Sequence, residues 1–172
     1  AALNWDDVKR FKDTHAIPLA LKGIATAEDA AMAVEHGVEV VYVSNHGGRQ
    51  LDHGRGALDV LPEVVKAVDG KARVWVDGGF SRGSDIVKAV AMGAELVGLG
   101  RLYCYALASA GEAGVARMFD ILKAELNEVL GLLGVTAFRQ LDGSYLHAAQ
   151  PVVQPHVHSA FPLTNLSDPG YR

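Results

Sequence analysis

The chain has 172 residues, 49% of them hydrophobic, and is therefore long enough to bury one sizeable core. Its formal net charge of −4 offers no basic surface to a nucleic acid, so we expect no nucleic-acid partner. The single cysteine excludes an internal disulfide framework, and no apolar run approaches the roughly 20 residues of a membrane helix, so we expect a cytoplasmic protein without a transmembrane segment.

Strand-like and helix-like segments alternate from one end of the chain to the other. Thr26 begins a capping sequence with acidic residues in the first helical turn, and Gly37 ends the helix that follows. Four short apolar runs with helices between them indicate a parallel sheet that is covered by helices. The predicted strands span residues 17–21, 38–44, 74–76 and 96–99, and the predicted helices span residues 4–14, 26–36, 59–68, 84–92 and 112–133.

Polar residues follow each predicted strand, as they do at the carboxyl ends of the strands of a β/α barrel, where the chemistry of such folds takes place. Four β/α units make only half of an eight-stranded barrel. An isolated half leaves two strand edges and an apolar sheet face uncovered. We therefore expect another half, from a second copy or from a different polypeptide.

From about Thr136 onward the alternation of strands and helices is lost. Prolines between residues 151 and 169 and scattered histidines predict an extended tail over residues 136–172, so that residues 1–135 form the folded domain. His147, His156 and His158 have the chemistry of metal ligands, but no helical or Cys-x-x-Cys framework holds them. We interpret them as exposed tail residues and expect no metal site.

The segment SNHGGRQLD, residues 44–52, follows the second predicted strand and carries the strongest chemical signal. The imidazole of His46 can move a proton near neutral pH, and the guanidinium of Arg49 can hold a carboxylate through two parallel hydrogen bonds. A lone histidine is usually a structural residue, but Gly47 and Gly48 leave space for a ligand beside His46. These residues predict a site that binds a small acid and takes a proton from it.

Glycines after the third and fourth strands indicate a phosphate site. Gly78, Gly79 and Gly100 expose backbone N–H groups that a phosphate can approach, and Arg101 adds a cationic fork. Tight turns alone are the alternative interpretation. Because glycines follow two consecutive strands and an arginine adjoins them, we favour phosphate.

Three further residues each leave more than one interpretation open. Asp77 either accepts hydrogen bonds from the hydroxyls of a ribose or ribityl chain or caps the turn that follows it. Lys22 either neutralises a developing anion, or forms a Schiff base, or makes a salt bridge at the barrel mouth. Cys104 lies in an apolar stretch, and we expect a core residue there in preference to a nucleophile.

Four segments together resemble the FMN-dependent 2-hydroxy-acid dehydrogenases and oxidases, a family that includes glycolate oxidase, lactate oxidase, mandelate dehydrogenase and flavocytochrome b2. The segments are LALKGIATAEDA, VSNHGGRQLD, VDGGFSRGSDIVKAVAMGA and GLGR, and the resemblance covers about residues 3–135. It implies an α/β fold that is the C-terminal half of a (β/α)8 TIM barrel, completed by an N-terminal half on another chain or fragment. It also implies an FMN cofactor and a homo-oligomer, a tetramer by family resemblance, and leaves membrane association through the missing half open.

The resemblance implies oxidation of an L-2-hydroxy acid to a 2-keto acid. His46 is similar to the base that removes a proton from the substrate, Arg49 to the clamp on the substrate carboxylate, and Lys22 to the residue that stabilises the reduced flavin. The residues that the resemblance assigns to cofactor binding are Lys22, Ser44, Asp77, Gly78, Gly79, Arg82, Gly100 and Arg101.

One position departs from the family pattern, which usually has two arginines where this chain has Ser81 and Arg82. Ser81 can donate a hydrogen bond that is weaker than a charged one, and Arg82 either compensates or faces the solvent. Two alternatives to the oxidation remain open: an FMN-dependent isomerase of the same barrel type, and a non-catalytic subunit that binds flavin or phosphate. The helix after Ser81 resembles the mandelate dehydrogenase branch, which favours an aryl or bulky acid.

Overall fold

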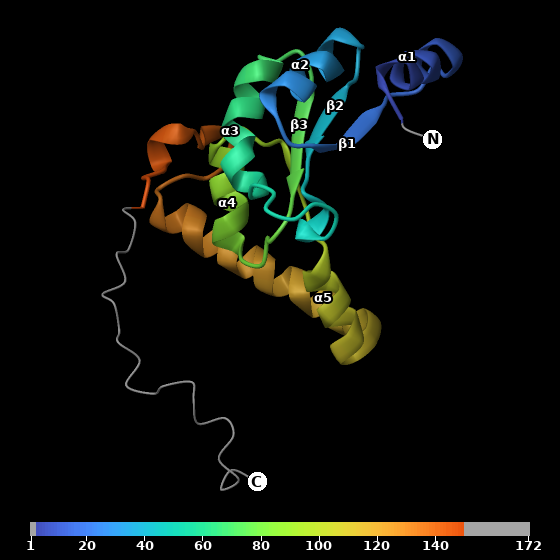
Figure 1. The fold of residues 1–172 in the computed structure, drawn as a ribbon. Helices are drawn as coiled ribbons and strands as arrows, with labels where there is room; N and C mark the ends of the chain where they lie inside the picture. Colours follow the sequence, from blue (N-terminus) through green and yellow to red (C-terminus); the bar gives the residue numbers. More distant parts are fainter. Residues whose placement is uncertain (1–2, 150–172) are drawn as a thin grey trace, which may run out of the picture.

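The computed structural model describes residues 3–149 and contains a four-stranded, fully parallel sheet with the strands in chain order (Figure 1). Because each strand pairs with the one before it in sequence, all four carboxyl ends lie at the same edge of the sheet. This confirms the predicted alternation of strands and helices. The strands are β1 (Ala20–Ile24), β2 (Val40–Val43), β3 (Arg73–Asp77) and β4 (Leu96–Gly98).

Helices connect the strands and cover one face of the sheet (Figure 1). Helix α2 begins as predicted, with the Thr26 side chain accepting a hydrogen bond from the backbone N–H of Asp29. Helix α3 tolerates Pro62 within its body. The helices are α1 (Trp5–Thr14), α2 (Ala27–Glu35), α3 (Ala57–Val68), α4 (Gly83–Ala91) and α5 (Arg101–Leu132).

The hydrophobic core lies between the sheet and the helices that cover it. Val41 and Val76, on neighbouring strands, are fully buried against Leu61 and Val64 of α3. Burial of each such side chain contributes about 1.5–3 kcal/mol relative to leaving it exposed. The core therefore fixes the strands, and with them the position of their carboxyl ends.

The opposite face of the sheet carries a row of large side chains that no described element covers. Lys22, Tyr42, Trp75 and Leu96 are consecutive register partners across the four strands. Leu96 is 42% exposed although it lies within a strand. In a closed barrel this face is the packed interior, so its exposure agrees with the prediction that the chain carries part of a barrel.

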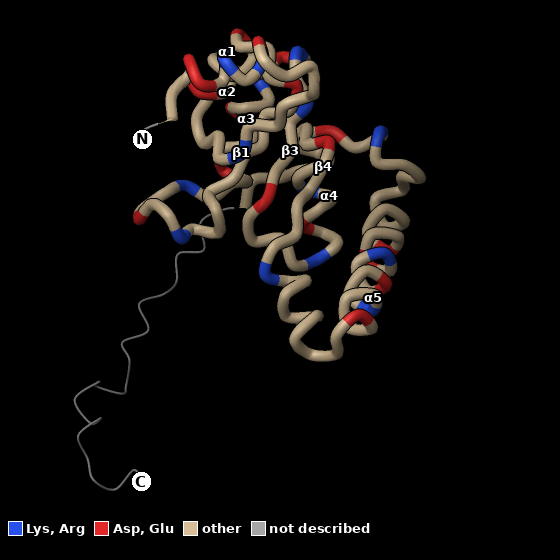
Figure 2. Tube along the Cα trace, turned by 90° about the vertical axis from the view of Figure 1, so that its right-hand side faces the viewer, with Lys and Arg blue, Asp and Glu red and all other residues tan. Residues whose placement is uncertain are grey.

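Helix α5 begins eleven residues before the predicted start at residue 112. Ala110 and Gly111 have non-helical backbone angles and divide it, so the prediction captured only the second part. The first part, residues 101–109, carries no charge beyond Arg101 (Figure 2). Several of its apolar side chains are exposed, among them Tyr103, Tyr105 and Leu107. Cys104 is exposed too, so the prediction that it is a core residue is wrong.

Residues 136–149 are not an extended tail, which corrects that part of the prediction for residues 136–172. They contain two 3-10 turns, Phe138–Gln140 and Gly143–Tyr145. Leu141, only 8% exposed, packs with Val87 of α4 and Leu130 of α5, and this burial explains why the segment folds back. The domain boundary between residues 135 and 136 stays a prediction.

Two further features concern the described residues alone. No helix within residues 3–149 combines the length and the apolar character needed to cross a membrane. The same part of the chain contains no group of three or more His, Cys, Asp or Glu side chains arranged to hold a metal ion. His147 is exposed, and the other two histidines considered as metal ligands, His156 and His158, lie outside the described residues.

Leu61→Ala should lower the free energy of unfolding by about 2–5 kcal/mol, because it leaves a cavity under the sheet. Leu132→Ala is the matched control: Leu132 is 82% exposed, and its loss should change the free energy by less than about 0.5 kcal/mol. Urea unfolding followed by circular dichroism measures both. Equal losses in the two variants would contradict the placement of the core.

Candidate functional site

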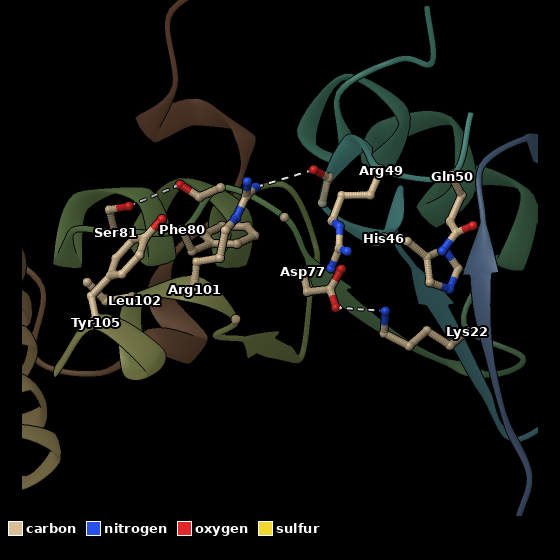
Figure 3. Close-up of a pocket in the computed structure, with 14 residues that line it drawn as sticks. Lys22, His46, Arg49, Gln50, Asp77, Phe80, Ser81, Arg101, Leu102 and Tyr105 are labelled. Atoms are coloured by element: carbon tan, nitrogen blue, oxygen red, sulfur yellow. Dashed lines mark hydrogen bonds and ion pairs between the residues drawn. The ribbon is translucent and has the colours of Figure 1, made fainter. Parts of the chain in front are cut away.

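A pocket of about 590 Å³ lies at the carboxyl ends of the strands (Figure 3). Four elements supply its walls: the end of β1, the loop after β2, the loop after β3 and the start of α5. The structure thus brings together most of the residues that the sequence predicts as a site. These are Lys22, His46, Arg49, Asp77, Gly78, Gly79, Gly100 and Arg101.

The ammonium of Lys22 joins three strand ends. Its Nζ lies 3.0 Å from Oδ2 of Asp77 and donates a hydrogen bond of 2.8 Å to Oγ of Ser44. The salt bridge that the sequence left as one interpretation of Lys22 is therefore present. It does not exclude a role toward a ligand, because Lys22 is 40% exposed and also lines the pocket.

Ser44 lies just behind the pocket wall and is only 2% exposed. Its Oγ accepts hydrogen bonds from the ammonium of Lys22 and, at 3.1 Å, from the backbone N–H of His46. Both bonds use oxygen lone pairs, so neither of them uses the hydroxyl hydrogen. Ser44 therefore couples the position of Lys22 to that of His46.

His46 begins a left-handed turn at the pocket mouth. His46, Gly47 and Gly48 have φ values of 54°, 74° and 72°, a conformation that a histidine seldom adopts. The Asn45 side chain stabilises the turn, because its Oδ1 accepts a 3.0 Å hydrogen bond from the backbone N–H of Gly47. The turn holds the imidazole over the end of β1.

Gly23 makes room for that imidazole. The β1–β2 register shifts between Lys22 and Ile24, and Gly23 occupies the irregular position with a φ of 103°. A Cβ atom at Gly23 would lie 2.9 Å from Cε1 of His46. The sequence analysis gave Gly23 no role; the one signal was a glycine directly after the strand-end lysine.

Asp77 presents an oxygen that has no partner among the described residues. Its Oδ2 pairs with Lys22, whereas Oδ1 is buried and makes no hydrogen bond there. Buried carboxylate oxygens are normally hydrogen-bonded, so Oδ1 is a ready acceptor for a ligand hydroxyl. The geometry favours the interpretation of Asp77 as a ligand acceptor over that of a turn cap.

Glycines form the far end of the pocket, where an anion can approach the backbone closely. A Cβ atom at Gly79 or Gly100 would meet nothing within 4 Å, so free space lies beside the Cα atom of each glycine, where a ligand can come close to the backbone. Arg101 extends from the start of α5, and its Nη2 donates a 3.3 Å hydrogen bond to the carbonyl of Gly47. One arginine therefore links the fourth strand end to the turn that carries His46.

Arg82, which the resemblance assigns to cofactor binding, does not line the pocket. Its Nε donates a 2.7 Å hydrogen bond to Oε1 of Glu125 on α5. The other oxygen of Glu125 accepts a 2.7 Å bond from the backbone N–H of Gly83 at the start of α4. That backbone bond, and then Arg82, lower the pKa of Glu125, so the carboxylate stays charged and keeps Arg82 away.

Arg49, in contrast, makes no ion pair or side-chain hydrogen bond within residues 3–149 and lines the pocket. A guanidinium without a protein partner can give its full donor set to a ligand carboxylate. Ser81, considered from the sequence as a weak hydrogen-bond donor, also lines the pocket. Four further neutral lining residues carry no sequence signal that marks them as part of a site. These are Gln50, Phe80, Leu102 and Tyr105.

Comparison with known proteins gives a consistent set of relatives. The family model described as FMN-dependent dehydrogenase matches residues 1–148. An L-lactate oxidase from Nostoc sp. is 49% identical over 146 residues, 85% of this chain and 40% of that protein. Glycolate oxidase 3 from Arabidopsis thaliana is 42% identical over 159 residues, 92% of this chain and 43% of that protein.

Solved structures agree with these relatives. A crystal structure of mandelate oxidase with benzoyl-formic acid matches with a TM-score of 0.78 and 41% identity, covering 81% of this chain and 42% of that one. The chain therefore spans about two fifths of the length of the relatives it matches. The family match continues through the two 3-10 turns after residue 135.

Gly23→Ala should displace the imidazole of His46, because the added methyl group would overlap Cε1. Gly37→Ala is the matched control: its φ of 69° imposes similar backbone strain, but a Cβ atom there meets nothing within 4 Å. NMR of the histidine Cε1 protons, with His46 assigned by its own substitution, measures the effect. A His46 signal that moves equally in both variants would contradict the contact.

Proposed function

The chain belongs to the family of FMN-dependent dehydrogenases, and from that membership we propose that it forms the FMN and substrate site of an enzyme that oxidises an L-2-hydroxy acid to a 2-keto acid. One observation carries the proposal: His46 and Arg49, which has no ion-pair partner within residues 3–149, line the same pocket as the Lys22–Asp77 pair. A proton acceptor and a carboxylate clamp are the two groups that this oxidation requires of the protein.

The pocket residues fit FMN along its length. The unpartnered Oδ1 of Asp77 suits a hydroxyl of the ribityl chain, and the open backbone at Gly79 and Gly100, with Arg101, suits the phosphate. Lys22 and Ser44 would hold the ring system through the ammonium and the hydroxyl hydrogen. FMN, when bound, accepts the two electrons that the oxidation removes from the substrate.

The chain's own residues would bind the acid and move its proton. Arg49 would hold the substrate carboxylate through two parallel hydrogen bonds, which orients the 2-carbon. The imidazole of His46, held by its turn and by the Ser44 bond, would then take the proton from the substrate. Lys22 places a positive charge where negative charge develops during the reaction.

Two other functions have less support. An isomerase of the same barrel type would use the phosphate end of the pocket, and a non-catalytic subunit would need only the cofactor residues. Neither explains why His46 and Arg49 face the same space. The relatives named above are oxidases of lactate, glycolate and mandelate, which also favours the oxidation.

We further propose that an N-terminal half, on a separate chain or as part of a longer one, completes the barrel. β1 and β4 each have one edge that no described strand pairs, and the row of Tyr42, Trp75 and Leu96 has no cover. A second hollow of about 270 Å³ runs along β1 beside Trp5 and Leu21, where a further strand would lie. Homo-oligomerisation and a cytoplasmic location remain proposals from the family resemblance.

Denaturing mass spectrometry of the native protein should therefore find either a chain longer than 172 residues or a second polypeptide. The reason is that an open half-barrel exposes two sheet edges. A folded, FMN-binding sample that contains this mass alone would contradict the barrel proposal.

His46→Ala should lower kcat by about 100- to 10,000-fold while FMN stays bound, because the variant loses the proton acceptor and no cofactor contact. His53→Ala is the matched control, since His53 lies in the same loop with its side chain 95% exposed, and it should keep wild-type turnover. Steady-state kinetics with the visible spectrum measures both. Normal turnover in His46→Ala would refute the assignment.

Arg49→Lys should raise KM for the acid roughly tenfold, because a point charge replaces the two-pronged donor. Arg82→Lys provides the comparison: Arg82 is held by Glu125 outside the pocket, so KM and FMN affinity should not change. The two variants are compared by initial rates over a range of acid concentrations. An equal rise in KM would mean that Arg49 does not bind the carboxylate.

A further inference from the structure

Tyr42 lies directly beneath the pocket and has no role in the proposed reaction so far. It is the register partner of Lys22 on β1 and of Trp75 on β3, so its side chain shares their face of the sheet. It comes two residues before Ser44, one pleat below the strand end. Its position brings it close to both members of the Lys22–Asp77 pair.

The Tyr42 ring supports the Lys22 ammonium. Nζ of Lys22 lies 5.2 Å from the ring centroid, within the range of a cation–π contact of about 6 Å. Trp75 holds the same ring from the next strand in an edge-to-face contact, with centroids 5.8 Å apart and planes at 77°. The ring is therefore fixed, whereas the lysine side chain above it is 40% exposed and long enough to adopt other rotamers.

The Tyr42 hydroxyl lies beside Asp77. A Cβ atom at Gly98 would be 2.2 Å from Oη of Tyr42 and 3.1 Å from Cβ of Asp77, so all three meet in space that only glycine leaves free. Burial, and then the negative charge of Asp77, raise the pKa of Tyr42. The phenol is therefore neutral at ordinary pH and adds no negative charge next to the carboxylate.

We propose that Tyr42 is a positioning residue for the Lys22–Asp77 pair, with its ring holding the ammonium at the pocket floor and its hydroxyl lying beside the Asp77 side chain, where it limits the movement of that side chain. As a consequence, the two carboxylate oxygens of Asp77 have different roles: Oδ2 pairs with Lys22, and Oδ1 stays open to a ligand. The expected effect of Tyr42 on FMN rests on the proposed function. The positioning of Lys22 and Asp77 by Tyr42 is the structural part of the proposal, and it does not depend on FMN.

Labelling of lysines tests the structural part in the full protein without FMN. An amine-reactive acetylating reagent is added briefly, and peptide mass spectrometry gives the rate at Lys22, with the exposed Lys71 as internal reference. Tyr42→Leu should raise the Lys22 rate roughly three- to fivefold, because the ammonium loses its cation–π contact. Tyr42→Phe keeps the ring and should leave that rate unchanged. Tyr42→Met, also without a π face, replaces the leucine variant if that does not fold.

Leu61→Ala separates positioning from general loss of stability, because Leu61 lies in the core away from the pocket. If Leu61→Ala raises the Lys22 rate as much as Tyr42→Leu does, the Lys22 effect is structural and the proposal is overturned. It is equally overturned if Tyr42→Leu leaves the rate at the wild-type value.

Two measurements on the FMN-loaded protein test the functional part. Tyr42→Leu should shift the midpoint potential of FMN in the same direction as Lys22→Met, but less, since Lys22→Met removes the positive charge whereas Tyr42→Leu only frees it to move away from the pocket floor. Tyr42→Phe should keep the potential and raise the FMN dissociation constant severalfold, since Asp77 loses its neighbour. Unchanged values in both variants would overturn this part, whereas a wild-type protein that binds no FMN would instead overturn the proposed function.

Discussion

The ammonium of Lys22 connects the ends of three neighbouring strands, and the rest of the site depends on that connection. It binds Asp77 on β3 and Ser44 at the end of β2, and Ser44 in turn holds the backbone of His46. This network can form because parallel strands in chain order present their carboxyl ends at one edge. The core on the opposite side of the sheet keeps the strands in register, so the geometry of the site depends on the packing of the core.

The open side of the sheet sets the strength of these interactions. Lys22 is 40% and Asp77 20% exposed, so water still screens their attraction. Covering the row of Tyr42, Trp75 and Leu96 with another barrel half would lower the local dielectric and strengthen every charge contact in the pocket. If the proposed barrel half covers this face, completion of the barrel would strengthen the contacts on which the proposed chemistry depends.

The sequence was sufficient to predict those site residues that combine a distinctive side-chain chemistry with a position near the end of a strand. In the structure Lys22 lies within β1, Asp77 ends β3 and Arg101 follows β4. Because parallel strands share an edge, these residues line one pocket as expected. Gly23 and Tyr42 were missed because their importance lies in contacts that only the folded chain reveals.

Where the structure differs from the predictions, the reasons are equally physical. The bond between Arg82 and Glu125, which places Arg82 outside the pocket, could not be foreseen because the two residues are 43 positions apart in sequence. Cys104 was placed in the core because hydrophobic composition does not distinguish a buried helix from one whose apolar side is left exposed.

The most direct test of the central claim is anaerobic addition of L-lactate, glycolate or L-mandelate to the complete protein loaded with FMN. The account predicts that at least one acid bleaches the visible flavin absorbance, and an FMN-loaded protein whose spectrum none of them changes would contradict it.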